Sequence, residues 1–274
     1  KKANISQNGG RVISAEMLGR LGNQMFVAAA AHSLALDNKD EAVFPNSISG
    51  ITPTDRETML HRKTIFRKLK YTDDLSFIEW LHAENTDHTH SPIEYKDNLF
   101  LKGYFQSEKY FKHNRNAIIE LFEPLKQIDD FLERKYSDLI KNKKAVSVHI
   151  RRGDYLQLQQ YHVIIGKEYY EEAKKQFDKD SVFVYFSDDI NWCKDTFKGD
   201  NSIFIEKQDD ILDMYLMSKI TNNIIANSSF SWWAAWLNKN EDKQVICPSN
   251  WFGPENRHLD VAKKDLIPKE WKVI

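Results

Sequence analysis

The second half of the chain alternates short apolar runs with longer amphipathic segments. The apolar runs at residues 145–150, 181–186 and 223–226 are rich in β-branched and aromatic side chains, which favour strands. Residues 168–177 and 209–220 have the length and composition of helices. Because strands that alternate with helices form parallel sheets, this pattern predicts a doubly wound α/β domain.

Polar side chains follow three of these predicted strands at the point where each strand ends. The sequence HIRRGD occupies residues 149–154, SDD occupies residues 187–189 and NSS occupies residues 227–229. In a parallel sheet these clusters share the carboxyl edge, where open α/β sheets bind their ligands. We therefore expect the three clusters to converge on one ligand.

The residue types in these clusters suit a nucleoside diphosphate. Arg151 and Arg152 are permanent cations whose planar fork matches phosphate oxygens, although a solvated surface turn would also accommodate them. Ser228 and Ser229 begin a predicted helix at residues 230–238, where serine hydroxyls either cap the helix or help to bind a phosphate. A carboxylate of the SDD cluster at residues 187–189 can accept two hydrogen bonds from guanine.

Asp188 and Asp189 also have a second interpretation, as ligands of a divalent ion in a metal-dependent sugar transferase. Paired arginines already neutralise a diphosphate. We therefore expect neither a metal ion nor any other cofactor.

The first half of the chain predicts a second strand–loop–helix unit. Residues 11–17 form a predicted strand, a loop with glycines at 19 and 22 follows, and residues 25–36 form an alanine-rich helix. This order presents backbone N–H groups to an anion or a sugar, although a tight turn alone would also need the glycines. The glycine spacing does not match the dinucleotide fingerprint.

Three further segments are predicted to be helical, namely residues 55–71, 106–122 and 129–144. The first has a basic face, which is either solvated or in contact with an anionic membrane surface. His88 and His90 lie in a polar loop without a third ligand, so we expect no metal site there.

Composition excludes several classes of protein. Lys and Arg number 39 against 40 Asp and Glu, which argues against nucleic-acid binding. Cys193 and Cys247 lack CxxC spacing, so a reducing cytoplasm is expected. No apolar run approaches the roughly 20 residues of a membrane-spanning helix. Any membrane contact is therefore expected to be peripheral, at the inner membrane.

Four stretches of the sequence stand out together: GRLGNQMF at residues 19–26, GYFQSEKYF at 103–111, HIRRGDY at 149–155 and NIIANSSFSWWAAWL at 223–237. In this order they resemble the bacterial α-1,2-fucosyltransferases of glycosyltransferase family 11. HIRRGDY alone is shared with other fucosyltransferase classes, whereas its combination with the last stretch is specific. Residues 45–98 contain no family landmark, and we expect acceptor specificity to reside there.

The resemblance implies a GT-B-like architecture, in which two Rossmann-like domains face each other. Residues 1–125 would form the acceptor side and residues 126–274 the donor side. The donor would be GDP-fucose, and no metal would be required.

The resemblance also implies roles for individual side chains. Arg151 would engage the β-phosphate, while His149 and Asp188 would help to place guanosine. Ser228 and Ser229 would bind the diphosphate. The N-terminal domain would contribute Arg20, Gly22 and Asn23.

Transfer from a β-linked donor to an α-linkage inverts the anomeric carbon, so no enzyme nucleophile is required. The transition state has oxocarbenium character, and the acceptor hydroxyl must lose a proton. Asp154 is the candidate base, because residues 155–165 contain no carboxylate and only His162. The alternative for Asp154 is a structural role in bracing Arg151 or the turn.

The sequence therefore predicts an inverting enzyme that moves L-fucose from GDP-fucose to the 2-hydroxyl of a terminal galactose-type residue. The acceptor would be an oligosaccharide or a lipid-linked glycan, and the oligomeric state is left open. One alternative is a GDP-fucose-dependent enzyme that makes an α-1,6 or O-fucosyl linkage. The other is a non-catalytic protein that binds nucleotide sugars or glycans.

Overall fold

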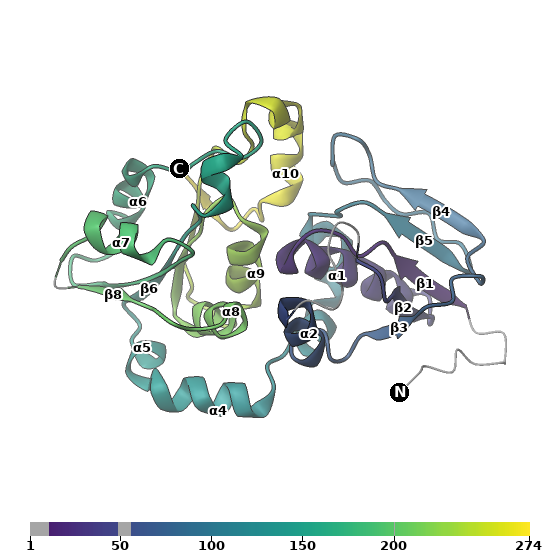
Figure 1. Ribbon diagram of the computed structural model, residues 1–274, viewed down its shortest axis with the longest axis horizontal. Helices are drawn as coiled ribbons and strands as arrows, with labels where there is room; N and C mark the ends of the chain where they lie inside the picture. The colour runs from purple at the N-terminus through teal and green to yellow at the C-terminus, as the bar shows by residue number, and fades with distance from the viewer. Residues whose placement is uncertain (1–10, 49–55, 200) are drawn as a thin grey trace. The chain divides into compact units, whose positions relative to one another are not determined.

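The chain divides into two compact units (Figure 1). The first comprises Lys1–Pro124 with Val261–Ile267, and the second comprises Leu125–Asp260 with Pro268–Ile274. The sequence prediction assigns residues 261–267 to the second domain, whereas in the structure they pack with the first. The computed structural model describes residues 11–48, 56–199 and 201–274.

Asp265 holds this late segment on the first unit. Its carboxylate forms an ion pair with Lys109 and accepts a hydrogen bond from the backbone N–H of His90 at 3.0 Å. Its backbone carbonyl accepts a hydrogen bond from the Ser107 hydroxyl at 2.7 Å. These contacts span more than 150 residues of sequence, which local sequence patterns do not encode.

The first unit contains a five-stranded sheet in the order β3-β2-β1-β5-β4, and every neighbouring pair is parallel. Parallel neighbours cannot be joined by a tight hairpin, so each pair requires a crossover connection. The strands are β1 (Val12–Ala15), β2 (Glu41–Pro45), β3 (Lys70–Thr72), β4 (Trp80–Ala83) and β5 (Leu99–Lys102).

Helix α1 (Leu21–Asp37) follows β1 and packs against β1 and β2 (Figure 1). Residues 25–31 of this helix are all buried, and four of them are alanines. Small side chains allow the helix to approach the sheet closely. The predicted strand, glycine loop and helix are thus confirmed.

The predicted helix at residues 55–71 is wrong in its second half. Helix α2 (Arg56–Lys63) ends early, and β3 begins at Lys70. At the end of α2 the Thr64 hydroxyl donates to the backbone carbonyl of Leu60 at 2.7 Å and shares it with the Thr64 N–H at 3.0 Å, an arrangement that weakens and bends a helix. Residue 55 lies outside the described part of the chain.

The predicted helix at residues 106–122 is also interrupted. The backbone at Phe111 is not helical, with φ −145° and ψ −5°. Its ring is buried, and the ring centroid lies 6.1 Å from that of Phe26. Burial of this ring overrides local helix propensity. The segment consists of the 3-10 helices η1 (Glu108–Tyr110) and η2 (Lys112–Asn114), followed by helix α3 (Arg115–Leu121).

The second unit contains a six-stranded parallel sheet in the order β11-β10-β9-β6-β7-β8. Its strand β6 is fully buried, which explains why four of its six residues are apolar. The strands are β6 (Ala145–Ile150), β7 (Val182–Ser187), β8 (Ser202–Phe204), β9 (Asn222–Ile224), β10 (Val245–Cys247) and β11 (Lys272–Val273).

Helices connect these strands, and the predicted helix at residues 129–144 is divided in two. The break falls at Tyr136, whose hydroxyl donates to Gln208 at 2.7 Å. The helices of this unit are α4 (Lys126–Lys135), α5 (Ser137–Lys141), α6 (Lys167–Lys174), α7 (Ile190–Thr196), α8 (Asp210–Lys219) and α9 (Ser229–Leu237). The 3-10 helices η3 (Asp154–Gln157) and η4 (Pro254–Ala262) complete the list, and α10 (Lys263–Leu266) lies in the late segment that belongs to the first unit.

Helix α9 is firmly anchored in the second unit, where it packs against α8 (Figure 1). Trp232, Trp233 and Trp236 are all buried, and each removes roughly 150–250 Å² from water. The start of α9 is therefore held in a fixed position at the carboxyl end of β9. Among the described residues, no helix is both long and apolar enough to span a membrane.

Candidate functional site

The sheet of the second unit brings the three predicted polar clusters to one edge. Strand β6 lies between β7 and β9, and all three are parallel. The register pairs Ile150 with Ser187, so the next residues, Arg151 and Asp188, are neighbours at the strand ends. The three clusters therefore lie at the same edge of the sheet, and their convergence on one ligand stays a prediction.

Arg151 is held between two carboxylates. Its Nη2 atom lies 2.6 Å from Oδ1 of Asp154, and its Nη1 atom lies 2.9 Å from Oδ2 of Asp188. The arginine side chain is 19% exposed, so these ion pairs are shielded from water more than surface pairs are. The guanidinium therefore has a fixed orientation at the end of β6.

Asp188 also fixes the backbone of the turn. Its Oδ1 atom accepts a hydrogen bond from the backbone N–H of Arg152 at 2.9 Å. A Cβ atom at Gly153 would lie 2.4 Å from Oδ2 of Asp188, so only glycine allows this close approach. The glycine in the RRGD sequence is thus explained by the position of the aspartate.

Arg152 is braced separately from Arg151. Its Nε atom lies 3.1 Å from Oδ2 of Asp189, and its guanidinium lies 4.0 Å from the centre of the Trp192 ring. Asp189 also caps α7, because its side chain accepts a hydrogen bond from the backbone N–H of Trp192. Arg152 and Asp189 thus form a supporting pair beside the Arg151 cluster.

His149 lies at the same edge as a neutral ring. The side chain is buried and packs 5.4 Å from the ring of Phe230. Burial, with a smaller contribution from the charge of Arg151, lowers the pKa of His149 to about 3. Its Nδ1 atom has no hydrogen-bond partner among the described residues, which is uncommon for a buried polar atom.

The two serines after β9 stand at the start of α9. The Ser228 hydroxyl caps the helix by accepting a hydrogen bond from the backbone N–H of Phe230 at 3.3 Å. Ser229 is the first residue of the helix and is half-buried. The capping role of Ser228 is confirmed. A capped helix N-terminus also offers N–H groups and a partial positive charge to an anion.

Two rings near Arg151 were not predicted as part of the site. The Tyr155 and His162 rings are stacked, with centroids 4.2 Å apart and planes 5° apart. The Arg151 guanidinium lies 5.3 Å from the centre of the Tyr155 ring. Burial lowers the pKa of His162, while the charge of Asp154 raises it. Only the tyrosine of the HIRRGDY stretch could have indicated this stack.

The predicted residues of the first unit surround the start of α1. Arg20 is exposed at the N-cap position, and Gly22 is buried in the first turn. The Asn23 side chain accepts a hydrogen bond from Gln106 at 2.8 Å. Gly19 has φ +68°, and a Cβ atom there would lie 2.5 Å from Asn23, so this position requires glycine.

Glu84 was not predicted, yet it fixes the loop that carries Gln106. Its buried carboxylate accepts hydrogen bonds of 2.8 Å from the backbone N–H groups of Tyr104 and Phe105. Phe105 has φ +50°, a strained conformation for a bulky residue, which these bonds help to hold. The same carboxylate accepts a hydrogen bond from Nδ1 of His88 at 2.8 Å, which gives this predicted loop histidine a structural partner.

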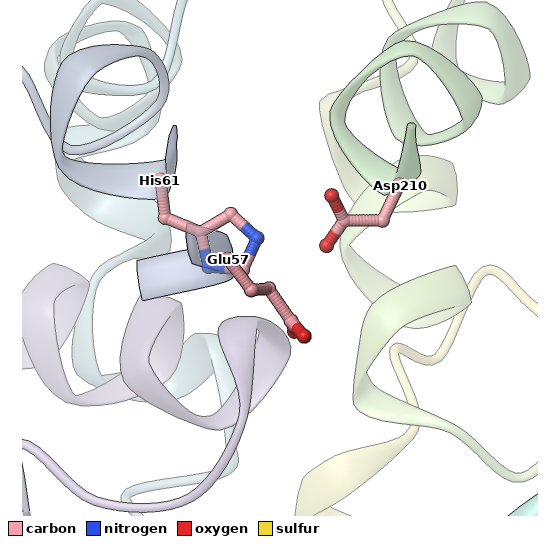
Figure 2. Close-up of side chains that lie close together, drawn as sticks. All are labelled: Glu57, His61 and Asp210. Atoms are coloured by element: carbon pink, nitrogen blue, oxygen red, sulfur yellow. The ribbon is translucent and has the colours of Figure 1, made fainter. Parts of the chain in front are cut away.

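Three further side chains have donor atoms that metals use. Glu57 and His61 lie one turn apart on α2, and Asp210 is the first residue of α8 (Figure 2). Because α2 belongs to the first unit and α8 to the second, we infer no metal site from them. The absence of a metal requirement stays a prediction.

The sequence matches a known family over nearly its whole length. The model for "Glycosyl transferase family 11" matches residues 5–274. The Escherichia coli O-antigen biosynthesis glycosyltransferase WbnK is 34% identical over 210 residues, which cover 70% of this chain and 66% of that protein. The Escherichia coli alpha-1,2-colitosyltransferase is 31% identical over 291 residues, which cover 95% of this chain and 98% of that protein.

Similarity extends to animal proteins and to solved structures. Galactoside alpha-(1,2)-fucosyltransferase 2 of Sus scrofa is 27% identical, covering 93% of this chain and 77% of that protein. The crystal structure of fucosyltransferase NodZ from Bradyrhizobium aligns with a TM-score of 0.53 at 12% identity, covering 82% of this chain and 93% of that one. A crystal of NodZ alpha-1,6-fucosyltransferase soaked with GDP-fucose gives a TM-score of 0.52 at 12% identity, with 83% and 92% coverage. The predicted fold class, α/β with two Rossmann-like domains of the GT-B type, is confirmed.

Proposed function

Because the chain belongs to glycosyltransferase family 11, we propose that it transfers L-fucose from GDP-fucose to the 2-hydroxyl group of a terminal galactose-type residue. The observation that carries this proposal is the family match over residues 5–274, which includes the cluster around Arg151. The acceptor would be an oligosaccharide or a lipid-linked glycan, and the latter would bring the enzyme to a membrane surface.

The donor diphosphate would bind at the carboxyl edge of the second sheet. Arg151 would bind the β-phosphate, and the start of α9 at Ser228 and Ser229 would provide N–H groups to the diphosphate. The neutral His149 ring would hydrogen-bond guanosine through its unpaired Nδ1 atom without adding charge. Asp188 retains its proposed contact with guanosine, in addition to its ion pair with Arg151.

Binding of the diphosphate would require Arg151 to exchange a partner. Arg151 and Arg152 supply two positive charges against three negative charges on the nearby aspartates, so an added anion must displace a carboxylate. Asp188 is also bonded to the backbone N–H of Arg152, whereas Asp154 is 38% exposed and lies in the short helix η3. Asp154 is therefore the partner that would leave.

This exchange would prepare the general base. In the present arrangement the Arg151 guanidinium occupies Oδ1 of Asp154 at 2.6 Å, so this oxygen is not free to contact an acceptor hydroxyl. Once the donor phosphate has taken the place of Asp154 beside Arg151, Asp154 can accept the proton of the attacking sugar hydroxyl. Donor binding and release of the base would thus be coupled through Arg151. The donor would therefore bind before the acceptor can react.

The displacement itself would be a single inverting step. The acceptor hydroxyl attacks the anomeric carbon of the fucose while the bond to GDP breaks, and the transition state carries oxocarbenium character. Arg151 and the start of α9 would stabilise the negative charge that develops on GDP. Since the arginine and the helix N-terminus supply this stabilisation, we propose that no metal ion is needed.

A second candidate donor is the GDP derivative of colitose. The observation that favours it is the 31% identity to the alpha-1,2-colitosyltransferase, which extends over 98% of that protein. Colitose is the 3-deoxy analogue of fucose, so the two donors differ by one hydroxyl group. A site that hydrogen-bonds this hydroxyl would reject colitose strongly, whereas an apolar site would accept both.

A transfer assay tests the proposal. The protein is incubated with GDP-fucose or with GDP-colitose, each with methyl β-galactoside, and GDP release and product mass are measured. GDP release with GDP-fucose should depend on the galactoside and should be lost with the 2-deoxygalactoside, which lacks the attacking hydroxyl. If the protein turns over GDP-colitose but not GDP-fucose, colitose and not fucose is the sugar transferred. Binding of GDP-fucose without turnover would favour the non-catalytic alternative.

A further inference from the structure

Residues 156–161 form an exposed loop that comprises the last two residues of η3 and the turn after it, and this loop begins two residues after the candidate base Asp154. Three of them have large apolar side chains that remain in contact with water: Leu156 is 40% exposed, Leu158 36% and Tyr161 40%. The other three residues are glutamines, which are also exposed. Apolar side chains gathered on a surface are typical of an interaction site.

The backbone of this loop is held by hydrogen bonds at both of its ends. The Leu156 N–H donates to the carbonyl of Arg152 at 2.9 Å, and the His162 N–H donates to the carbonyl of Leu158 at 3.0 Å. The loop therefore keeps its apolar side chains exposed while its backbone is ordered. Ordering before a ligand arrives lowers the entropy cost of binding.

Residues 253–255 of the same unit form hydrogen bonds with the last two residues of the loop. The N–H groups of Gly253 and Glu255 donate to the carbonyls of Tyr161 and Gln160, each at 2.8 Å. A Cβ atom at Gly253 would lie 2.6 Å from the carbonyl carbon of Tyr161, so this close approach requires glycine. The position of Tyr161 is thus fixed by two segments that are distant in sequence.

The chemistry of the loop suits a neutral sugar chain. Residues 155–165 contain no Asp, Glu, Lys or Arg, although 29% of the chain is charged. Glutamine amides both donate and accept hydrogen bonds, as sugar hydroxyl groups do. Tyrosine offers a rigid apolar face with a polar end, which can cover the apolar side of a sugar ring. Without basic residues the loop has no attraction for an anionic membrane surface.

We infer that the loop at residues 156–161 binds the neutral oligosaccharide part of the acceptor, beyond the galactose that receives fucose. This inference rests on the proposed function, because the loop follows Asp154 within two residues and the reacting hydroxyl must reach that carboxylate. The loop adds to residues 45–98 as a determinant of acceptor choice. It acts through contacts with sugars distant from the reacting bond.

Steady-state kinetics with acceptors of different length test the inference. Tyr161→Ala should raise the KM for a tetrasaccharide ending in β-galactose by about tenfold, the loss of roughly one well-packed aromatic contact. The KM for methyl β-galactoside and the affinity for GDP should change by less than about twofold, because neither ligand reaches the loop. Gln157→Ala should act in the same direction with a smaller effect.

Ile203→Ala is the matched control. Ile203 is 37% exposed on β8, the edge strand of the second unit's sheet. Its truncation should leave both KM values and the affinity for GDP unchanged. If Tyr161→Ala leaves the tetrasaccharide KM unchanged, or alters GDP affinity to the same extent, the loop is not an acceptor site.

Direct binding separates this inference from the proposed function. Saturation-transfer NMR with GDP and the tetrasaccharide, without a fucose donor, should show contact that is lost in Tyr161→Ala and retained in Ile203→Ala. Loop-dependent binding without any transfer would support the loop and refute the proposed enzyme. Failure of the unmodified protein to bind the tetrasaccharide, or binding that persists in Tyr161→Ala, would overturn the inference even if transfer to methyl β-galactoside occurs.

Discussion

Oδ2 of Asp188 lies 2.9 Å from Nη1 of Arg151, and its second carboxylate oxygen accepts the backbone N–H of Arg152. One side chain from the end of β7 therefore fixes both the guanidinium and the turn at the end of β6. The sequence assigns Asp188 a contact with guanosine, and the structure adds this bracing role. The two roles predict different kinetic effects.

Asp188→Asn should lower kcat and weaken GDP binding together, because the amide removes the ion pair that orients Arg151. A neutral hydrogen bond replaces a charge-assisted one, so we expect a loss of about tenfold or more in kcat/KM. Kinetics with GDP-fucose and calorimetry with GDP measure both effects.

Asp189→Asn is the control for this change, since Asp189 pairs with Arg152 and caps α7 without contacting Arg151. Asp189→Asn should lower the free energy of unfolding, because the cap of α7 is weakened, and should leave kcat nearly unchanged. A bracing role for Asp188 would be refuted if Asp188→Asn raised only the KM for GDP-fucose, which is the result expected from a guanine contact alone.

Asp154→Asn should separate turnover from nucleotide affinity. Loss of the base should reduce kcat by about 100-fold or more. The same change removes the partner that competes with phosphate for Arg151, so GDP should bind about two- to fivefold more tightly, as expected for a partly exposed ion pair worth roughly 0.5–1 kcal/mol. Weaker GDP binding in this variant would contradict the proposed exchange of partners.

Chelation tests the predicted independence from metals. Excess EDTA should leave the rate of fucose transfer unchanged, because Arg151 and the start of α9 are proposed to stabilise the departing diphosphate. Protein treated with EDTA and then dialysed is the control for slow loss of a bound ion. Loss of activity that Mn²⁺ or Mg²⁺ restores would return Asp188 and Asp189 to the role of metal ligands.

The buried His149 predicts a pH dependence of stability. Its pKa is about 3 in the folded protein and near 6.5 when unfolded, so the unfolded chain binds the additional proton between these values. This contribution is fully present above pH 6.5 and is lost as the pH falls toward 3, by at most about 1.4 kcal/mol per pH unit.

Urea unfolding of the wild-type protein and of His149→Asn at pH 7, 6, 5 and 4 checks this expectation. The variant cannot take up the proton, so its free energy of unfolding should fall less steeply than that of the wild type. If the free energy of unfolding fell equally steeply with decreasing pH in both proteins, His149 would be charged or exposed in the folded state.

Much of the second unit follows directly from its sequence. Apolar runs with polar ends predict parallel strands, and the end of each run marks the sheet edge at which Arg151, Asp188 and Ser228 lie. The local pair of Arg151 with Asp154 was one of the two roles that the sequence left open for Asp154. The pair of Arg151 with Asp188 was not predicted, because it depends on the register of β6 with β7.

The less predictable features depend on contacts between distant residues. Helical propensity over residues 106–122 is overridden by burial of the Phe111 ring. The attachment of residues 261–267 to the first unit depends on Asp265, whose partners lie far away in the sequence. Glu84 was not predicted because a buried carboxylate that binds backbone N–H groups has no sequence pattern of its own.

The structure of the reaction product tests the central claim most directly. After incubation with GDP-fucose and a β-galactoside, NMR of the purified product gives both the position of the new linkage and its anomeric configuration. A single fucose in α-configuration on the 2-oxygen of the terminal galactose is the predicted result. A fucose on another oxygen, or in the β-configuration that retention would give, would contradict the proposed inverting α-1,2 transfer.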